Sequence, residues 1–180
     1  MTAAAGSQVA VAGGGDEAAD SLTALRADVA KLKANAPSQS HTMSDVGYHW
    51  TNLWFAAEKK NWPLAMFYFQ EARDHIVWTI RLRPVRKADD GSDVNLMPIF
   101  QSIDTSAFKA VTDAIQAQDS TAFIAAYRES LAACHGCHKA SGKPYLRPQV
   151  PTAPAQTRVT SAPISRPTWT AGLAGLQRRQ

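Results

Sequence analysis

The chain of 180 residues has few cysteines and no long apolar run. A transmembrane helix needs roughly 18 or more consecutive, mostly apolar residues, so we expect no transmembrane segment. The opening stretch also lacks the positively charged start and the apolar centre of a signal peptide. The two cysteines are too few for a disulfide-rich secreted protein, and their separation by only two residues suits chemistry better than a structural disulfide.

Several patterns of catalysis and nucleic-acid binding are also missing. The sequence has no Ser/His/Asp set, no glycine-rich phosphate loop, no paired carboxylates at a defined spacing and no interleaving of basic and aromatic residues. We therefore expect neither an enzyme nor a nucleic-acid-binding protein. The net charge of +4 is a mild excess that suits a partner with an acidic docking surface.

Sustained alternation of apolar and polar residues, which a half-buried strand requires, is absent, whereas helical periodicity is frequent. We therefore predict an all-α protein. A flexible N-terminal segment is predicted over residues 1–16 and an accessory amphipathic helix over residues 17–36. An antiparallel four-helix bundle is predicted over residues 40–148, followed by a proline-rich disordered tail over residues 149–180. The accessory helix and the tail are candidates for assembly, including a homo-oligomer.

The four bundle helices are predicted from apolar residues that recur every three or four positions. Residues 84–102 are expected to form a long connection between the second and third helices. Asp104 or Thr105 is expected to start the third helix, and Asp119 the fourth. In an antiparallel bundle the fourth helix ends beside the beginnings of the first and third helices and the end of the second. Its packing face is predicted to include Ile124, Tyr127, Leu131, Cys134 and His138.

The end of the fourth helix carries the motif CHGCH, in which Cys134, Cys137 and His138 form the C-x-x-C-H pattern of covalent haem attachment. Each thiol adds across a vinyl group of haem to form a thioether, and the following histidine can ligate the iron. A zinc site that uses both cysteines and either His135 or His138 is a second interpretation, which needs a fourth ligand from elsewhere. A third interpretation is a redox-active cysteine pair. In a fourth, the two cysteines only pack as small apolar residues.

This motif near the end of a four-helix bundle resembles the class II c-type cytochromes, of the cytochrome c′ and cytochrome c556 type. A fainter resemblance, through MSDVGYHWTNLWFAAEKKNWPLA and the pattern C-x-x-CH-x-A-x-G, is to bacterial proteins without an assigned activity. The first resemblance implies one covalent haem c on Cys134 and Cys137, with His138 as the proximal iron ligand. It also implies a methionine ligand from the start of the first bundle helix, a position that Met43 fits. Because haem c is attached outside the cytoplasm, a periplasmic protein is implied as well.

The second axial position of the iron decides the chemistry, because a strong ligand favours electron transfer while an open position admits small gases. Met43 is the first candidate, and the others are His49, His41, Met97 or an open position. We expect a monohaem c-type cytochrome that carries single electrons between redox partner proteins. One alternative is a five-coordinate haem protein that binds or senses a gas such as NO. Another is a non-haem helical adaptor with a zinc or thiol site at the motif.

Overall fold

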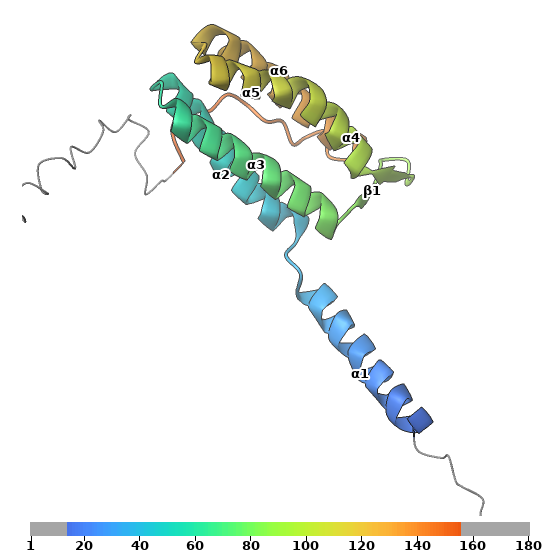
Figure 1. Cartoon of the computed structure of the whole chain (residues 1–180). Helices are drawn as coiled ribbons and strands as arrows, with labels where there is room; N and C mark the ends of the chain where they lie inside the picture. Colours follow the sequence, from blue (N-terminus) through green and yellow to red (C-terminus); the bar gives the residue numbers. More distant parts are fainter. Residues whose placement is uncertain (1–13, 156–180) are drawn as a thin grey trace, which may run out of the picture. The chain divides into compact units, whose positions relative to one another are not determined.

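The computed structural model describes residues 14–155, which divide into two units between Pro37 and Ser38 (Figure 1). Most of the predicted flexible segment, residues 1–13, lies outside the described residues, as does the predicted disordered tail from residue 156 onward. Residues 149–155, the described part of that tail, form neither helix nor strand.

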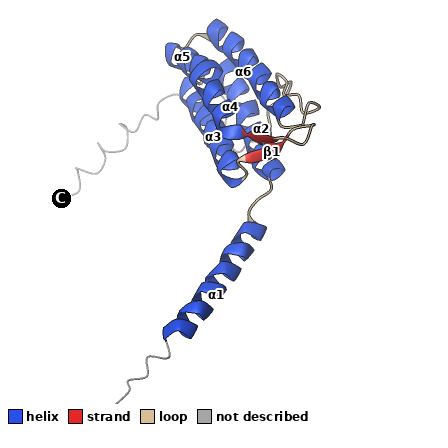
Figure 2. Cartoon of the chain, turned by 90° about the vertical axis from the view of Figure 1, so that its right-hand side faces the viewer, coloured by secondary structure: helices blue, strands red, loops and turns tan. Residues whose placement is uncertain are grey.

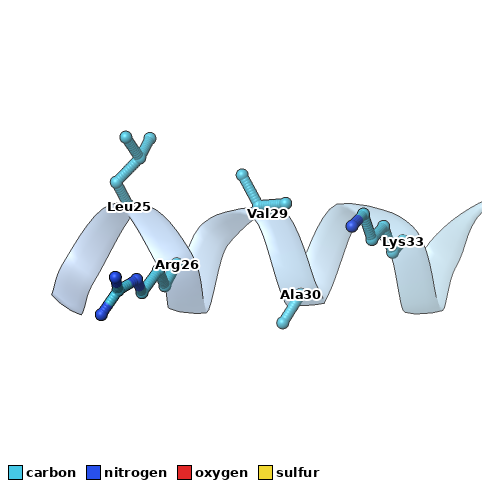
Figure 3. A pocket seen from close by; sticks show the side chains of 5 residues that line it. All are labelled: Leu25, Arg26, Val29, Ala30 and Lys33. Atoms are coloured by element: carbon cyan, nitrogen blue, oxygen red, sulfur yellow. The ribbon is translucent and has the colours of Figure 1, made fainter. Parts of the chain in front are cut away.

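The first unit contributes one described helix, α1 (Gly14–Asn35), which covers the predicted accessory helix and begins three residues before it, inside the segment predicted as flexible. Figure 3 shows Leu25 and Val29 projecting from the same side of α1, where they help to line a shallow hollow in its surface. The apolar stripe of α1 is between 40 and 71% exposed and consists of Leu22, Leu25, Val29 and Leu32. The helix is thus amphipathic, and its apolar side is largely exposed.

The second unit is mostly helical (Figure 2), as predicted for an all-α chain. None of the helices within residues 14–155 is long and apolar enough to cross a membrane. The elements of this unit follow in the order α2 (Gln39–Glu58), α3 (Trp62–Leu82), β1 (Val85–Lys87), β2 (Asp93–Asn95), α4 (Leu96–Ile103), the π-helical turn η1 (Asp104–Phe108), α5 (Lys109–Ala117) and α6 (Ser120–Ala140).

The core of the second unit joins helices that are far apart in the sequence. Helix α2 packs along α3, α6 packs against α5, α4 and α2, and α5 also contacts α3. The ring of Trp50 from α2 stacks on Phe108 at a centroid distance of 5.0 Å and on Tyr127 at 5.3 Å. Leu53, one turn after Trp50, is fully buried. Burial of these large apolar side chains, at roughly 1.5 to 3 kcal/mol each, is what holds the helices together.

The connection after α3 contains regular structure that the sequence did not predict. Strands β1 and β2 pair antiparallel, with Val85 opposite Asn95. Each strand has three residues with one partly buried side chain between two exposed ones, which is too short for an alternation to be recognised. The long connection expected over residues 84–102 therefore contains a β-hairpin and most of helix α4.

The start of the third helical segment was also predicted too late. Helix α4 begins at Leu96, where the side chain of Asn95 accepts a hydrogen bond from the backbone N–H of Met97 at 3.2 Å. Pro98 falls in the first turn of α4, where a helix tolerates its missing N–H. Helix α4, η1 and α5 then follow without a break, so Asp104 lies inside a helical segment rather than at its start.

Candidate functional site

Helix α6 carries the CHGCH motif in its last two turns. The side chain of Asp119 caps the start of α6 by accepting hydrogen bonds from two backbone N–H groups, at 2.8 and 3.0 Å. Tyr127 and Leu131 are buried, as predicted, but Ile124 is 41% exposed and was wrongly placed on the packing face. Phe123, one position earlier and four before Tyr127, takes that place in the core.

Both cysteines lie on the packing side of α6 as free thiols and are partly buried against the apolar core. Burial, and to a smaller extent the neighbouring Cys137, raises the pKa of Cys134 to about 12. Burial also raises the pKa of Cys137, although a hydrogen bond with Ser141 opposes this. Both thiols are therefore protonated at neutral pH. A thioredoxin-type redox pair needs a thiolate, so these surroundings disfavour that interpretation.

The imidazole of His138 is held by a backbone carbonyl beyond the end of α6. Its Nδ1 lies 2.8 Å from the carbonyl oxygen of Leu146. A carbonyl oxygen can only accept a hydrogen bond, so Nδ1 carries the proton, and the lone pair of the neutral ring is then on Nε2. An imidazole with Nδ1 bonded to a backbone carbonyl and Nε2 free is oriented as metal-ligating histidines usually are.

The chain folds back over the last turn of α6 to supply this carbonyl. The backbone N–H of Lys143 donates to the carbonyl oxygen of His138 at 2.8 Å, and the N–H of Leu146 donates to the carbonyl oxygen of Lys143 at 3.0 Å. The other histidine of the motif, His135, has Nε2 2.9 Å from the carbonyl oxygen of Pro144. The segment from Lys143 to Leu146 is thus fixed against both histidines of the motif.

Gly142 makes this turn possible. Its φ of +67° is in the left-handed region that favours glycine, and a Cβ built there would lie 3.0 Å from the carbonyl oxygen of Lys87. Lys87 belongs to β1, which follows the end of α3. Because α3 runs back along α2, the hairpin of β1 and β2 marks the end of the unit at which α2 begins (Figures 1 and 2). The motif therefore lies at that end.

Met43 lies on α2 at about the level of the motif. The Tyr127 hydroxyl donates to the carbonyl oxygen of Trp50 at 3.0 Å, which fixes the height of α6 against α2. Cys134 follows Tyr127 by seven residues, and Met43 precedes Trp50 by seven. Since the two helices run in opposite directions and each rises about 1.5 Å per residue, both residues lie about 10 Å from that hydrogen bond towards the same end. Met43 is partly buried there.

The other candidate axial ligands are placed differently. His49 stacks on His75 of α3, with ring centroids 5.1 Å apart, so its ring is engaged with α3. His41 is exposed in the first turn of α2, where its backbone N–H donates to the capping Ser38. Met97 is not in an irregular loop as expected, but in the first turn of α4, partly buried against the core.

The grouping of His49 with Glu71 and His75 was missed in the sequence. One potential ligand atom from each of these residues lies within 4.8 Å of the other two. Glu71 and His75 stand four residues apart in a helix, a spacing that puts both on one face and could have been noticed. The third member comes from α2, so the pairing of two helices was needed to find it.

Comparisons with protein-family models, with curated proteins and with solved structures found no match for this chain.

Proposed function

We propose that this chain is a monohaem c-type cytochrome that carries single electrons, built on an antiparallel four-helix bundle. The observation that carries the proposal is the hydrogen bond between His138 Nδ1 and the carbonyl oxygen of Leu146 at 2.8 Å. It leaves Nε2 of the histidine next to Cys137 free as a ligand atom, with which the chain would bind the iron of a covalently attached haem. Neither a cysteine pair that only packs nor a redox pair requires a fixed imidazole.

The two thiols also fit covalent attachment. Each thiol would add across one vinyl group of the haem, with its S–H hydrogen going to one vinyl carbon and its sulfur to the other, so no external oxidant or reductant would be needed. Cys134 and Cys137 are free thiols with raised pKa values and lie one helical turn apart, with His138 directly after them. Their partial burial against the apolar core provides the water-poor surroundings that tune a haem potential.

Haem c, when attached, supplies an iron that alternates between the ferrous and ferric states. The chain would hold it through Cys134, Cys137 and the Nε2 of His138. Met43 is the proposed second ligand, because it is partly buried at the level of Cys134 on a helix that packs against α6. The thioether of Met43 would supply the second ligand from the protein, which would suit the iron to electron transfer.

The proposed partners are redox proteins with an acidic docking surface. Lys139 and Arg147 are exposed beside the motif, and Lys143 lies between them in the same returning segment. Positive charge around a redox centre raises the rate of encounter with an acidic partner, and salt screens this effect. A periplasmic location follows from the proposal, since haem c is attached outside the cytoplasm.

The experiment is to express the full chain together with a haem c maturation system and to test for haem that survives denaturation. Covalent haem is expected in the unaltered chain and not in Cys134→Ser/Cys137→Ser. His135→Ala is the matched control, because it removes the other histidine of the motif and should leave covalent haem in place. A colourless unaltered chain would contradict the proposal.

The second ligand is tested by the absorption spectrum of the same holoprotein. We expect a low-spin spectrum that becomes high-spin in Met43→Ala. A low-spin spectrum that persists in this variant would contradict Met43 and direct the search to His41 or Met97. A high-spin spectrum of the unaltered protein would instead favour the gas-binding alternative, with an open position on the iron.

A further inference from the structure

A group of three potential metal ligands lies on the paired helices α2 and α3, apart from the cysteine motif. His49 comes from α2, and Glu71 and His75 come from successive turns of one face of α3. The potential ligand atoms of the three side chains all lie within 4.8 Å of one another. Figure 1 shows α2 and α3 side by side, so both elements that supply the group belong to the most closely paired part of the fold.

Within the group, potential metal-ligating atoms lack short hydrogen bonds to other described residues. The rings of His49 and His75 are stacked, with centroids 5.1 Å apart and planes inclined by 19°. Nε2 of His75 is 3.9 Å from the nearer Glu71 oxygen, which is too long for a hydrogen bond. Nδ1 of His49 is buried without a hydrogen-bond partner among the described residues. A buried polar atom without a hydrogen-bond partner destabilises a folded protein, and a bound ligand at this atom would remove that cost.

The electrostatic surroundings keep the imidazole of His49 available as a ligand. Burial is the largest influence and lowers the pKa of His49, and the neighbouring His75 lowers it further. The carboxylates of Glu71 and Asp45 act in the opposite direction. The ring is therefore neutral at pH 7, with one nitrogen lone pair free, and a metal ion would not have to displace a proton from it.

We propose that His49, Glu71 and His75 bind one divalent transition-metal ion of the zinc type, which links α2 to α3. Two imidazoles and one carboxylate form a donor set that suits zinc and its neighbours better than calcium or magnesium. In a tetrahedral site with bonds of about 2.0 to 2.1 Å the ligand atoms are roughly 3.3 Å apart, so small side-chain rotations close the group around an ion. The partial exposure of Glu71 and His75, at 42 and 25%, leaves the fourth position to water.

This site is independent of the haem proposal. His49 follows Met43 by six residues, which is about 9 Å along the axis of α2, and its ring is engaged with α3. Zinc bound at the cysteines would be a different event. The test therefore uses both the unaltered full chain and the full-length Cys134→Ser/Cys137→Ser variant, in which the thiols cannot contribute.

The test is a calorimetric titration of the metal-free full chain with Zn²⁺, repeated with Co²⁺ to record the visible absorption of a tetrahedral site. One ion per chain is expected in the Cys134→Ser/Cys137→Ser background. In that background His75→Asn and Glu71→Gln should each weaken binding at least tenfold, since each loses one of three ligands. His41→Asn is the matched control and should bind as before, because His41 is exposed and outside the group.

Two results would overturn the proposal: no zinc binding in the Cys134→Ser/Cys137→Ser background, or zinc binding there that Glu71→Gln and His75→Asn leave unchanged. Glu71→Gln keeps the size of a side chain that is 42% exposed, so it tests the site even where a histidine substitution disturbs the fold. Failure of zinc binding would leave the haem result untouched, and a colourless chain would leave the zinc titration valid.

Discussion

Tyr127 provides a stability test of the contact that sets α6 against α2. Its side chain is fully buried, its hydroxyl donates to the carbonyl oxygen of Trp50 at 3.0 Å, and its ring lies 5.3 and 4.9 Å from the rings of Trp50 and Trp54. Tyr127→Phe removes the hydroxyl and keeps the ring. A helical carbonyl also accepts a bond from the N–H four residues on, so the Trp50 oxygen is not left without a partner. We therefore expect the free energy of unfolding to fall by about 1 kcal/mol at pH 8.

The pH dependence of the same variant gives the sharper result. Burial, assisted by Cys134, raises the pKa of Tyr127 above its ordinary value near 10. Because the pKa is raised in the folded state, the protonated Tyr127 hydroxyl contributes fully to the free energy of unfolding below about pH 10. This contribution is lost as the pH rises further, because the unfolded chain releases the proton first. The loss is about 0.8 kcal/mol at pH 10.5 and about 1.4 kcal/mol at pH 11. The phenylalanine variant has no such loss, so the two proteins should be equally stable between about pH 10.5 and 11.

The measurement is urea unfolding of both full chains, followed by far-ultraviolet circular dichroism at pH 8, 10, 10.5 and 11. The ionisation of lysines affects both proteins alike, so the difference between them reports Tyr127 together with its neighbour Cys134. A difference that stays the same from pH 8 to pH 11 would mean that the hydroxyl ionises as freely in the folded protein as in the unfolded one. The burial of Tyr127, and with it the placing of Met43 at the level of Cys134, would then be refuted.

Substitutions at three further positions test elements around the site, each by urea unfolding against the unaltered chain. Gly142→Ala should cost about 1 to 2 kcal/mol, because φ is +67° and a Cβ would lie 3.0 Å from the Lys87 carbonyl oxygen; an unchanged stability would contradict the close approach. Asp119→Ala should cost about 1 kcal/mol, since it removes the cap of α6, and Asp119→Asn should recover most of it. Asp104→Asn breaks the two-pronged ion pair with Arg73, at 2.6 and 2.7 Å, and should cost about 0.5 to 1 kcal/mol at low salt and less at high salt; a loss that salt does not reduce would contradict a partly exposed ion pair.

The helices could be predicted from the sequence because their buried residues repeat with the helical period. Trp50, Leu53 and Ala57 on α2 are all buried where that period places them. The error at Ile124 arose because a stripe can be drawn through either of two neighbouring positions, and only the packing partners decide between them. Here Phe123 contacts the rings of Trp54 and Trp62 and thereby takes the buried place.

The early start of α4 could not be recognised because its signals were ambiguous. Met97 followed by Pro98 is typical of a helix break, yet the same proline is tolerated in the first turn once Asn95 caps the helix. Strands β1 and β2 are three residues long and exposed at both ends, so they have no period to detect.

The environment of His138 could not have been predicted for a different reason, which also shows how the site is built. The motif identifies the histidine, but the group that orients it is the carbonyl oxygen of Leu146, and any residue can supply a carbonyl. What positions this oxygen is the turn at Gly142, where the sequence does matter because φ is positive and the backbone of Lys87 is close. The Leu146 side chain is 47% exposed, and it is the backbone of this residue that bonds His138. Substitution of the Leu146 side chain should therefore disturb the position of the imidazole less than the addition of a Cβ at Gly142. This holds although the hydrogen bond of the imidazole is to Leu146 and not to Gly142.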